Sequence, residues 1–174
     1  AAGDRPSRLR HGLDRHGNGQ RAVGGAALRL FATSLPAGAG DGGFPHRSRQ
    51  RAVQVLFAWD LRRQSLDELF DDYYATLSSD SDDPEPKRLT SDEFMEDLVR
   101  GTVRSVESVD QRISASSSNW RIERMSTVDR NILRLAVFEM MHGGTPAPVV
   151  IDEALELARQ FGGDESRSFV NGIL

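Results

Sequence analysis

Residues 126–141 read STVDRNILRLAVFEMM, and this stretch decides the fold class. Its apolar residues recur at intervals of three and four, as on one face of an α-helix, at Val128, Ile132, Leu135, Ala136 and Met140. A second set widens this face and predicts a central helix that is buried over much of its surface: Leu133, Val137 and Met141. Ser126 is a candidate N-cap for the helix, and residues 143–146, GGTP, predict its end.

The same helical period continues toward the N-terminus. Residues 47–63 carry an apolar stripe made of Ala52, Val55, Leu56 and Trp59, with Val53 and Phe57 beside it. Capping-box spacing in residues 65–68 and 90–93 predicts the starts of two more helices, and the stripe of the second continues to Ile113. Gly101 in that helix predicts the close approach of another helix, because an interior glycine costs up to ~1 kcal/mol relative to alanine.

Two further helices are predicted toward the C-terminus, over residues 149–161 and 166–174, the last one cut short where the sequence ends. The acidic residues 78–88, which include two prolines, are expected to form a solvated loop. Trp120 and Ile122 are expected to be core anchors. No segment alternates like a strand and no internal repeat is present, so the predicted fold class is all-α.

Composition narrows the class of protein. A chain of 174 residues with 38% hydrophobic and 28% charged residues suits one globular domain with a charged surface. No apolar run approaches the ~20 residues that cross a bilayer, so no membrane partner is expected. Cysteine is absent, which excludes disulfides and thiolate sites and fits a reducing compartment; we therefore expect a cytoplasmic protein.

Charge is distributed unevenly along the chain. Residues 1–45 hold six arginines and three aspartates, whereas residues 46–174 hold 16 basic and 23 acidic residues, a net charge of −7. Residues 1–45 are rich in glycine and poor in large apolar residues, which favours a disordered or non-native N-terminal extension. An organellar transit peptide and a functional basic arm are the alternatives. The acidic remainder can bind nucleic acid only through a local positive cluster.

The sequence lacks the patterns that are typical of catalysis or of a metal centre. None of the four histidines has a partner at ligand spacing: His11, His16, His46 and His142. Neither a nucleophile elbow nor a phosphate-binding glycine loop is present. Adjacent acids such as Asp152 and Glu153 point about 100° apart on a helix, so they do not share a site. We therefore expect no enzyme, no cofactor and no metal.

Five motifs follow one another in a specific order. They are RSRQRAVQVLFAWD at residues 47–60, SNW at 118–120, STVDRNILRL at 126–135, IDEALELAR at 151–159, and FG followed by FVNG at 161–172. In this order and spacing they resemble the NusB family across nearly all of residues 46–174. The resemblance implies a compact bundle of about seven helices, with residues 46–174 as an RNA-binding domain.

The same resemblance implies a role in transcription antitermination. Members of this family pair with NusE, a small-subunit ribosomal protein, and the pair binds boxA RNA in nascent ribosomal transcripts, within an RNA polymerase antitermination complex. Two positions depart from the family pattern. Ser168 stands where a lysine is common, which puts one phosphate contact in doubt, and Thr127 replaces a proline.

The densest positive cluster of residues 46–174 comprises Arg47, Arg49 and Arg51. A helix N-terminus favours acids, so cations there indicate an external anion such as RNA phosphate; the alternative is a solvated helix start. Three phosphate contacts give a salt slope of only about −2 on a single strand, which predicts help from a basic protein. Gln54 and Phe57 can contact a base one turn further along, although Phe57 is favoured as a core residue.

A second set of candidate RNA contacts opens the last predicted helix. Glu165 and Ser166 stand at its start, where backbone N–H groups can bind phosphate, and Asn171 follows. Capping of the helix is the alternative interpretation for the first two, and a hydrogen bond within the core for Asn171. By resemblance, Asp129 is the candidate contact to the NusE-like protein; its alternative is an acid that stabilises a helix N-terminus.

Two other functions stay open at this stage. Some ribosomal RNA cytosine-5 methyltransferases carry a NusB-like N-terminal domain, and sequence beyond Leu174 with a glycine-rich cofactor site would indicate one of these. A helical scaffold that binds only proteins is the second alternative, in which case RNA binding is absent. The sequence does not distinguish a monomer from a dimer.

Overall fold

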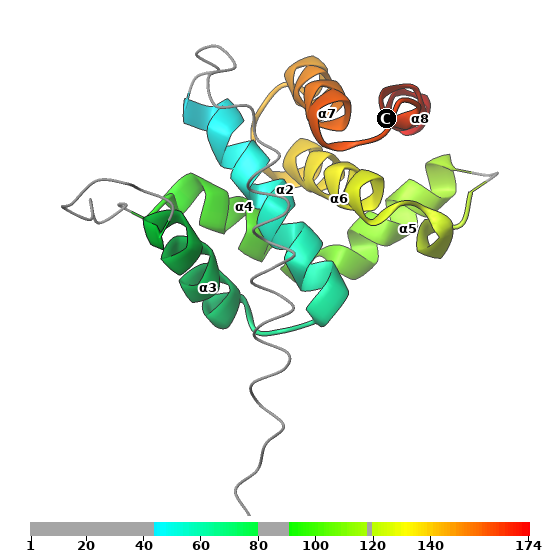
Figure 1. Cartoon of the computed structure of the whole chain (residues 1–174). Coiled ribbons are helices and arrows are strands. Elements are labelled where there is room, and N and C mark those ends of the chain that lie inside the picture. Colours follow the sequence, from blue (N-terminus) through cyan, green and yellow to red (C-terminus); the bar gives the residue numbers. More distant parts are fainter. Residues whose placement is uncertain (1–43, 80–90, 118–119) are drawn as a thin grey trace, which may run out of the picture.

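The computed structural model describes residues 44–79, 91–117 and 120–174. These residues form seven α-helices, a short 3₁₀ helix and no strands (Figure 1), namely α2 (Phe44–Arg62), α3 (Leu66–Ser79), α4 (Glu93–Arg104), α5 (Val106–Ser116), η1 (Ile122–Arg124), α6 (Thr127–His142), α7 (Ala147–Phe161) and α8 (Ser166–Ile173). The all-α prediction is therefore confirmed. No described helix is long and apolar enough to span a membrane.

Helix α6 forms the centre of the bundle, as its wide apolar face predicts. It packs against α2, α4, α5, α7 and α8. Its buried residues cover most of its circumference: Asp129, Asn131, Ile132, Leu133, Arg134, Leu135, Ala136, Val137 and Glu139. The hydroxyl of Ser126 accepts a hydrogen bond from the backbone N–H of Asp129 at 3.0 Å, which confirms the predicted N-cap. The helix ends at Gly143.

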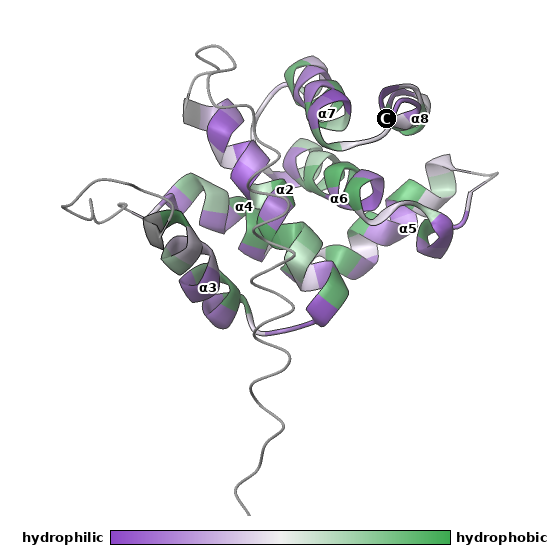
Figure 2. Ribbon diagram, in the orientation of Figure 1, coloured by the Kyte–Doolittle hydropathy of each residue, from purple (hydrophilic) through white to green (hydrophobic). Residues whose placement is uncertain are grey.

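Helix α2 crosses α4 and α6 and supplies the other half of the core. Its buried face carries Ala52, Val53, Val55, Leu56 and Ala58. In Figure 2 the hydrophobic colouring of α2 and α6 concentrates where the two helices face their neighbours, while α3 exposes a hydrophilic side. Burying these side chains is the main favourable contribution to stability, at roughly 25 cal/mol per Å² of apolar surface.

Ion pairs fix the C-terminal half of α2 against α6. The Asp60 carboxylate is buried and accepts hydrogen bonds from Arg130 at 2.8 Å and from Asn131 at 3.2 Å. Arg134 lies 3.1 Å from Asp60 and also makes a two-point contact with Asp110 of α5, both distances being 2.7 Å. Burial by itself raises the pKa of Asp60, but the hydrogen bond from Arg130 and the charges of both arginines outweigh it and lower the pKa.

Gly101 and Ser105 shape the region where α4 is followed by α5. A Cβ at Gly101 would lie 2.1 Å from Cζ of Phe138 on α6, so the predicted close helix approach is confirmed. The prediction of a single helix that continues to Ile113 is wrong, because α4 ends at Arg104 and α5 begins at Val106. Ser105 between them leaves helical geometry with ψ at 10°, and its carbonyl accepts a hydrogen bond from the Ser108 hydroxyl.

Other predictions are corrected in detail. Trp120 is 55% exposed and is not a core anchor, whereas Ile122 is buried as expected. Helix α4 is capped by Asp92, which accepts from the N–H of Met95 at 3.0 Å. The first helix among the described residues, α2, begins at Phe44, two residues before the predicted boundary. The rest of the predicted extension and most of the predicted loop at residues 78–88 lie outside the described residues.

Candidate nucleic-acid interface

The arginines at the start of α2 do not share one exposed surface. Arg49 is 5% exposed and makes two hydrogen bonds to the buried Glu139 carboxylate of α6, one of them 2.9 Å from Nε to Oε2. Its guanidinium also lies 3.8 Å from Glu153 and 5.6 Å from the centre of the Phe94 ring. The hydrogen bond to Glu139 raises the pKa of Arg49. The anion that this arginine binds is therefore internal.

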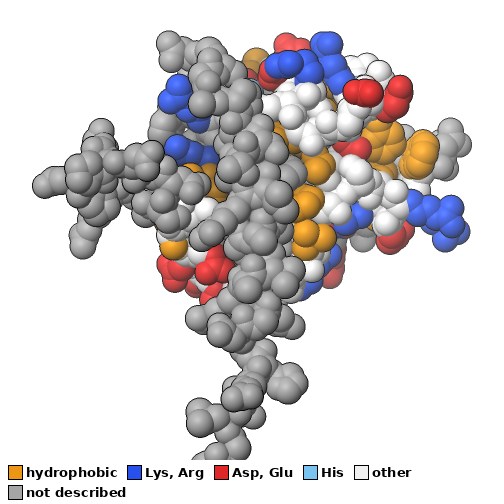
Figure 3. Space-filling model, viewed as in Figure 1, with side chains coloured by type: hydrophobic (Ala, Val, Ile, Leu, Met, Phe, Trp, Pro, Cys, Tyr) orange, Lys and Arg blue, Asp and Glu red, His pale blue; other side chains and the backbone are white. Residues whose placement is uncertain are grey.

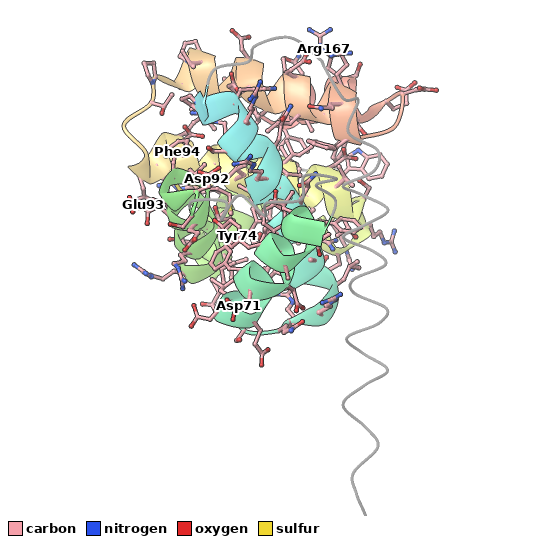
Figure 4. The ribbon with its side chains drawn as sticks, turned by 60° about the vertical axis from the view of Figure 1, so that its left-hand side comes forward. Asp71, Tyr74, Asp92, Glu93, Phe94 and Arg167 are labelled. Carbon is pink, nitrogen blue, oxygen red and sulfur yellow. The ribbon has the colours of Figure 1, made fainter. Side chains whose placement is uncertain are left out.

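Arg51 is held in the same way by the cap of α4. Its Nη1 donates to Asp92 at 2.8 Å, and the same carboxylate accepts from the Ser48 hydroxyl at 2.9 Å. The Tyr74 hydroxyl accepts a hydrogen bond from the backbone N–H of Asp92 at 2.8 Å. Figure 4 shows Tyr74 and Asp92 together where α3 meets the start of α4. Asp92 therefore joins α2, α3 and α4, and Arg51 contributes one hydrogen bond to this junction.

Arg47 is the exposed member of the cluster, and its neighbours join α2 to α7. The Nδ1 atom of His46 lies 2.7 Å from Glu153 of α7. Gln50 donates to Gln160 of α7 at 2.7 Å and lies 2.9 Å from Nε2 of His46. These contacts fix the first turns of α2 against the C-terminal half of α7, and α8 packs against α7 in turn.

Glu156 lies at the centre of this end of the molecule. Its pKa is lowered, first by the hydrogen bond from Arg159 and further by the charges of His46 on α2 and Arg167 on α8. The charges of three helices therefore act on one carboxylate. In Figure 4 Arg167 projects from α8 at the same edge of the molecule as the start of α2. Arg159 of α7 and Arg167 of α8 are exposed and act on Glu156, and the exposed Arg47 follows His46 in the first turns of α2.

At the start of α8, neither Glu165 nor Ser166 caps the helix in the way that the sequence suggested. Ser166 is buried, and its hydroxyl accepts a hydrogen bond from the N–H of Gly163 at 2.9 Å, which closes the turn between α7 and α8. Glu165 occupies the N-cap position without a side-chain cap bond. Glu165 and Asn171 are exposed. The two exposed residues are accessible to a ligand, whereas Ser166 positions the helix.

Gln54 is placed inside the molecule and not at its surface. It is 2% exposed, and its Oε1 accepts a hydrogen bond from the Tyr73 hydroxyl at 3.3 Å. It follows the buried periodicity of α2, so the predicted base contact is corrected: in this structure Gln54 connects α2 to α3. Phe57, its companion in that prediction, is half-buried.

Asp129 lies at the opposite end of α6 from the Arg49–Glu139 pair. It is 8% exposed, and its Oδ2 accepts from the Ser126 hydroxyl at 2.8 Å. Its Oδ1 has no hydrogen-bond partner among the residues that the structure describes. A buried acceptor without a partner costs about 1–3 kcal/mol.

The described part of the chain contains no group of three or more histidine, aspartate or glutamate side chains that would hold a metal ion. What it does offer is a small basic and polar surface at the α2–α7–α8 end of an otherwise acidic domain. A model of the NusB family matches residues 46–174. The chain belongs to the NusB family.

Two curated relatives in this family align with this chain over most of their length. The chain is 58% identical over 128 residues to the transcription antitermination protein NusB of Solibacter usitatus, covering 74% of this chain and 84% of that protein. It is 41% identical over 130 residues to the protein of the same name from Streptomyces griseus, covering 74% and 87%. Both relatives are bacterial proteins named for transcription antitermination.

Solved NusB structures share the fold. NusB of T. maritima has 32% sequence identity and a TM-score of 0.61, covering 74% of this chain and 86% of that one. A NusB chain crystallised with NusE and double-stranded RNA has 27% identity and the same TM-score, covering 75% and 92%. That complex contains an RNA and a NusE protein as the partners of a NusB fold.

Sequence reasoning missed the internal anions, although one signal was available. Arg49 precedes Ala52, Val53 and Leu56 by three, four and seven residues, so it lies on the buried stripe of α2 and needs a buried counter-ion. Arg167 was also missed. It stands beside Ser168, where the family lysine is absent, and supplies a positive charge at the neighbouring position.

Proposed function

We propose that this NusB family member is an RNA-binding transcription antitermination factor that pairs with the NusE ribosomal protein on boxA-type RNA. In this role it supports ribosomal RNA transcription as part of the RNA polymerase antitermination complex. The names of its relatives and the NusB–NusE–RNA structure support the assignment. A factor that binds nascent bacterial RNA works where transcription takes place, in the cytoplasm.

The observation that carries this proposal is the surface where α2, α7 and α8 meet. Arg47 and Arg167 are exposed there, with Glu165 and Asn171 beside them on α8. Arg49, Arg51 and Ser166 hold the helices that present this surface. Two exposed arginines give a salt slope of about −1.4 on single-stranded RNA, which corresponds to weak binding. A basic partner that adds phosphate contacts therefore explains why the protein works as one half of a pair.

We assign the partner contact to Asp129. A side-chain or backbone donor of a basic protein would satisfy its unmatched Oδ1. The proposed role is non-catalytic: near this surface His46 pairs with Glu153 and Arg159 pairs with Glu156, and these described pairs offer no nucleophile with an adjacent base. The antitermination name of the relatives favours this role over a ribosomal RNA methyltransferase or a scaffold that binds only proteins.

Fluorescence anisotropy of a labelled boxA RNA tests the proposal. We expect weak binding by the chain alone, tighter binding when the NusE ribosomal protein is present, and preference over a scrambled RNA of the same length. Asp129→Asn keeps the size of the side chain, and we expect it to reduce the effect of the partner while RNA binding by the chain alone stays the same. Absence of RNA binding in every mixture would favour the scaffold instead.

A further inference from the structure

Trp120 is the most exposed aromatic side chain whose burial the structure describes, and the fold does not explain its exposure. It is 55% exposed, although its position in the chain predicts a core residue. Its backbone is fixed on both sides: its N–H donates to the Ser117 carbonyl at 3.1 Å, and its own carbonyl accepts from the Ser117 hydroxyl at 3.1 Å. A large apolar ring held out in water is a feature that a ligand would stabilise.

The ring is oriented by a contact with α8. The Trp120 and Phe169 rings lie 5.6 Å apart, centre to centre, with 82° between their planes. In this edge-to-face arrangement one aromatic ring braces the other and leaves a face of the tryptophan open. Phe169 is on the helix that also carries Glu165, Arg167 and Asn171 of the proposed RNA surface. Trp120 is therefore joined to that surface through α8.

Positive charge lies next to the ring. Trp120 lines an open hollow of about 730 Å³ together with residues of α5, the turn that follows it and η1, namely Ser114, Ser117, Arg121, Ile122, Glu123 and Arg124. Arg121 and Arg124 are exposed. Among the described residues that line this hollow, Glu123 is the one acid beside two arginines, so their summed charge is positive. Figure 3 shows hydrophobic side chains between α8 and η1, with basic side chains beside them.

We infer that Trp120 is a stacking platform for an unpaired base of the bound RNA, with Arg121 and Arg124 beside it as phosphate contacts. An aromatic face next to arginines is the combination with which proteins bind single-stranded nucleic acid. A protein partner would also bind a tryptophan, but the flanking arginines and the connection through α8 favour RNA. Glu123 repels phosphate, yet its carboxylate can accept a hydrogen bond from an exocyclic amino group of a base.

This inference rests on the proposed function, and its test separates the two. The probe is fluorescein-labelled boxA RNA, measured with the full chain and the NusE ribosomal protein. We expect Trp120→Ala to weaken RNA binding about five- to a hundredfold, the range for the loss of one stacked base, and Trp120→Phe to retain most of the affinity. Leu61→Ala is the matched control, because Leu61 is also 55% exposed but has no aromatic face; it should leave the affinity unchanged.

Two further readouts extend the test, and the second, which uses Trp120→Phe, holds even if Trp120→Ala folds poorly. RNA that carries single abasic positions should bind the wild type more weakly at one position, and that loss should disappear in Trp120→Ala, since the stacked pair is then already broken. Stacking should also change the tryptophan emission of the wild type on RNA binding, and the change should be absent in Trp120→Phe.

Three outcomes overturn the inference. In the first, Trp120→Ala binds RNA within twofold of wild type while Arg47→Ala weakens binding, which leaves the proposed function standing. In the second, Trp120→Ala loses affinity for the NusE protein in the absence of RNA, which makes Trp120 a protein contact. In the third, the wild type binds no RNA at all, and the proposed function fails together with the inference.

Discussion

The two ends of α2 use ion pairs in opposite senses. At the N-terminal end the cations Arg49 and Arg51 are on α2, and their carboxylates come from α6 and α4. At the C-terminal end the carboxylate of Asp60 is on α2, and it pairs with Arg130 and Arg134 of α6 and with Arg63, which follows α2. Asp60 lies in the last turn of α2, where the helix dipole disfavours an acid, whereas Arg49 and Arg51 lie beyond the first turn. The partner helices therefore supply the stabilisation.

The difference between the two ends lies in what the pairs leave exposed. At the C-terminal end Asp60 pairs with the largely buried Arg130 and Arg134, and its third arginine, the exposed Arg63, also lies 4.3 Å from the centre of the Trp59 ring. At the N-terminal end Arg47 is exposed, next to His46, which contacts α7. Both ends of the helix thus hold the fold, and the N-terminal end is the one to which we assign RNA binding.

The largest expected effect is at Asp60. Asp60→Ala leaves the buried charges of Arg130 and Arg134 without this carboxylate, and we expect it to lower the free energy of unfolding by about 3–5 kcal/mol. Urea unfolding followed by circular dichroism measures the loss. Asp71→Ala, an exposed acid on α3, is the control and should change stability by less than about 0.5 kcal/mol. Similar losses for the two variants would show that the Asp60 cluster does not stabilise the fold.

Substitutions of Arg49 and Arg47 should differ in their effect on the free energy of unfolding. Arg49→Ala leaves Glu139 buried without its counter-ion, and we expect a loss of about 3 kcal/mol in the free energy of unfolding. Arg47→Ala should change it by less than about 0.5 kcal/mol because that side chain is exposed. Urea melts of both variants make the comparison. If Arg49→Ala were as stable as wild type, the assignment of Arg49 to the fold would be wrong.

Lowering the pH should reduce the contribution of Asp60 to the free energy of unfolding in a defined pH range. The pKa of Asp60 is lower in the folded chain than the value of about 3.9 for an unfolded aspartate. Its contribution is therefore complete above about pH 4 and is lost as the pH falls through the folded pKa. We expect the stability difference between wild type and Asp60→Asn to narrow below about pH 4 in urea melts at several pH values. A constant difference down to pH 3 would contradict this assignment.

The periodicity of the sequence was sufficient for the architecture but not for the charges. The stripe of residues 126–141 predicted a central α6 because burying apolar side chains dictates the arrangement of its neighbours. The periodicity of the preceding helices did not predict the break at Ser105, since a serine inside a helical pattern gives only a weak local signal. The arginines of α2 were predicted as one group because a linear sequence does not show that Glu139 and Asp92 lie opposite them.

Trp120 is a second residue whose environment could not be predicted from the sequence. Residue type alone predicts burial for a tryptophan, because its ring is large and apolar. Its exposure depends on where η1 and α8 lie in space, which no local pattern discloses. Identification of the family required the order of several motifs. By contrast, the division of candidate residues into those that hold the fold and those that face a ligand required the three-dimensional contacts.

The smallest expected effect is that of single exposed arginines on RNA binding. Arg47→Ala should make the salt slope of boxA RNA binding about 0.7 shallower, the value for one phosphate contact on a single strand. Arg104→Ala, an exposed arginine at the far end of α4 from Asp92, is the matched control and should leave the slope unchanged. A slope that changes equally in both variants would indicate a general field rather than a local site.

The most direct test of the RNA surface is the salt dependence of boxA RNA binding for the double variant Arg47→Ala/Arg167→Ala, measured with the NusE ribosomal protein present. The proposed surface predicts weaker binding than wild type and a slope about 1.4 shallower, because two phosphate contacts on single-stranded RNA are lost. Wild-type affinity and slope in the double variant would place the RNA elsewhere on the molecule and contradict the assignment of the α2–α7–α8 surface.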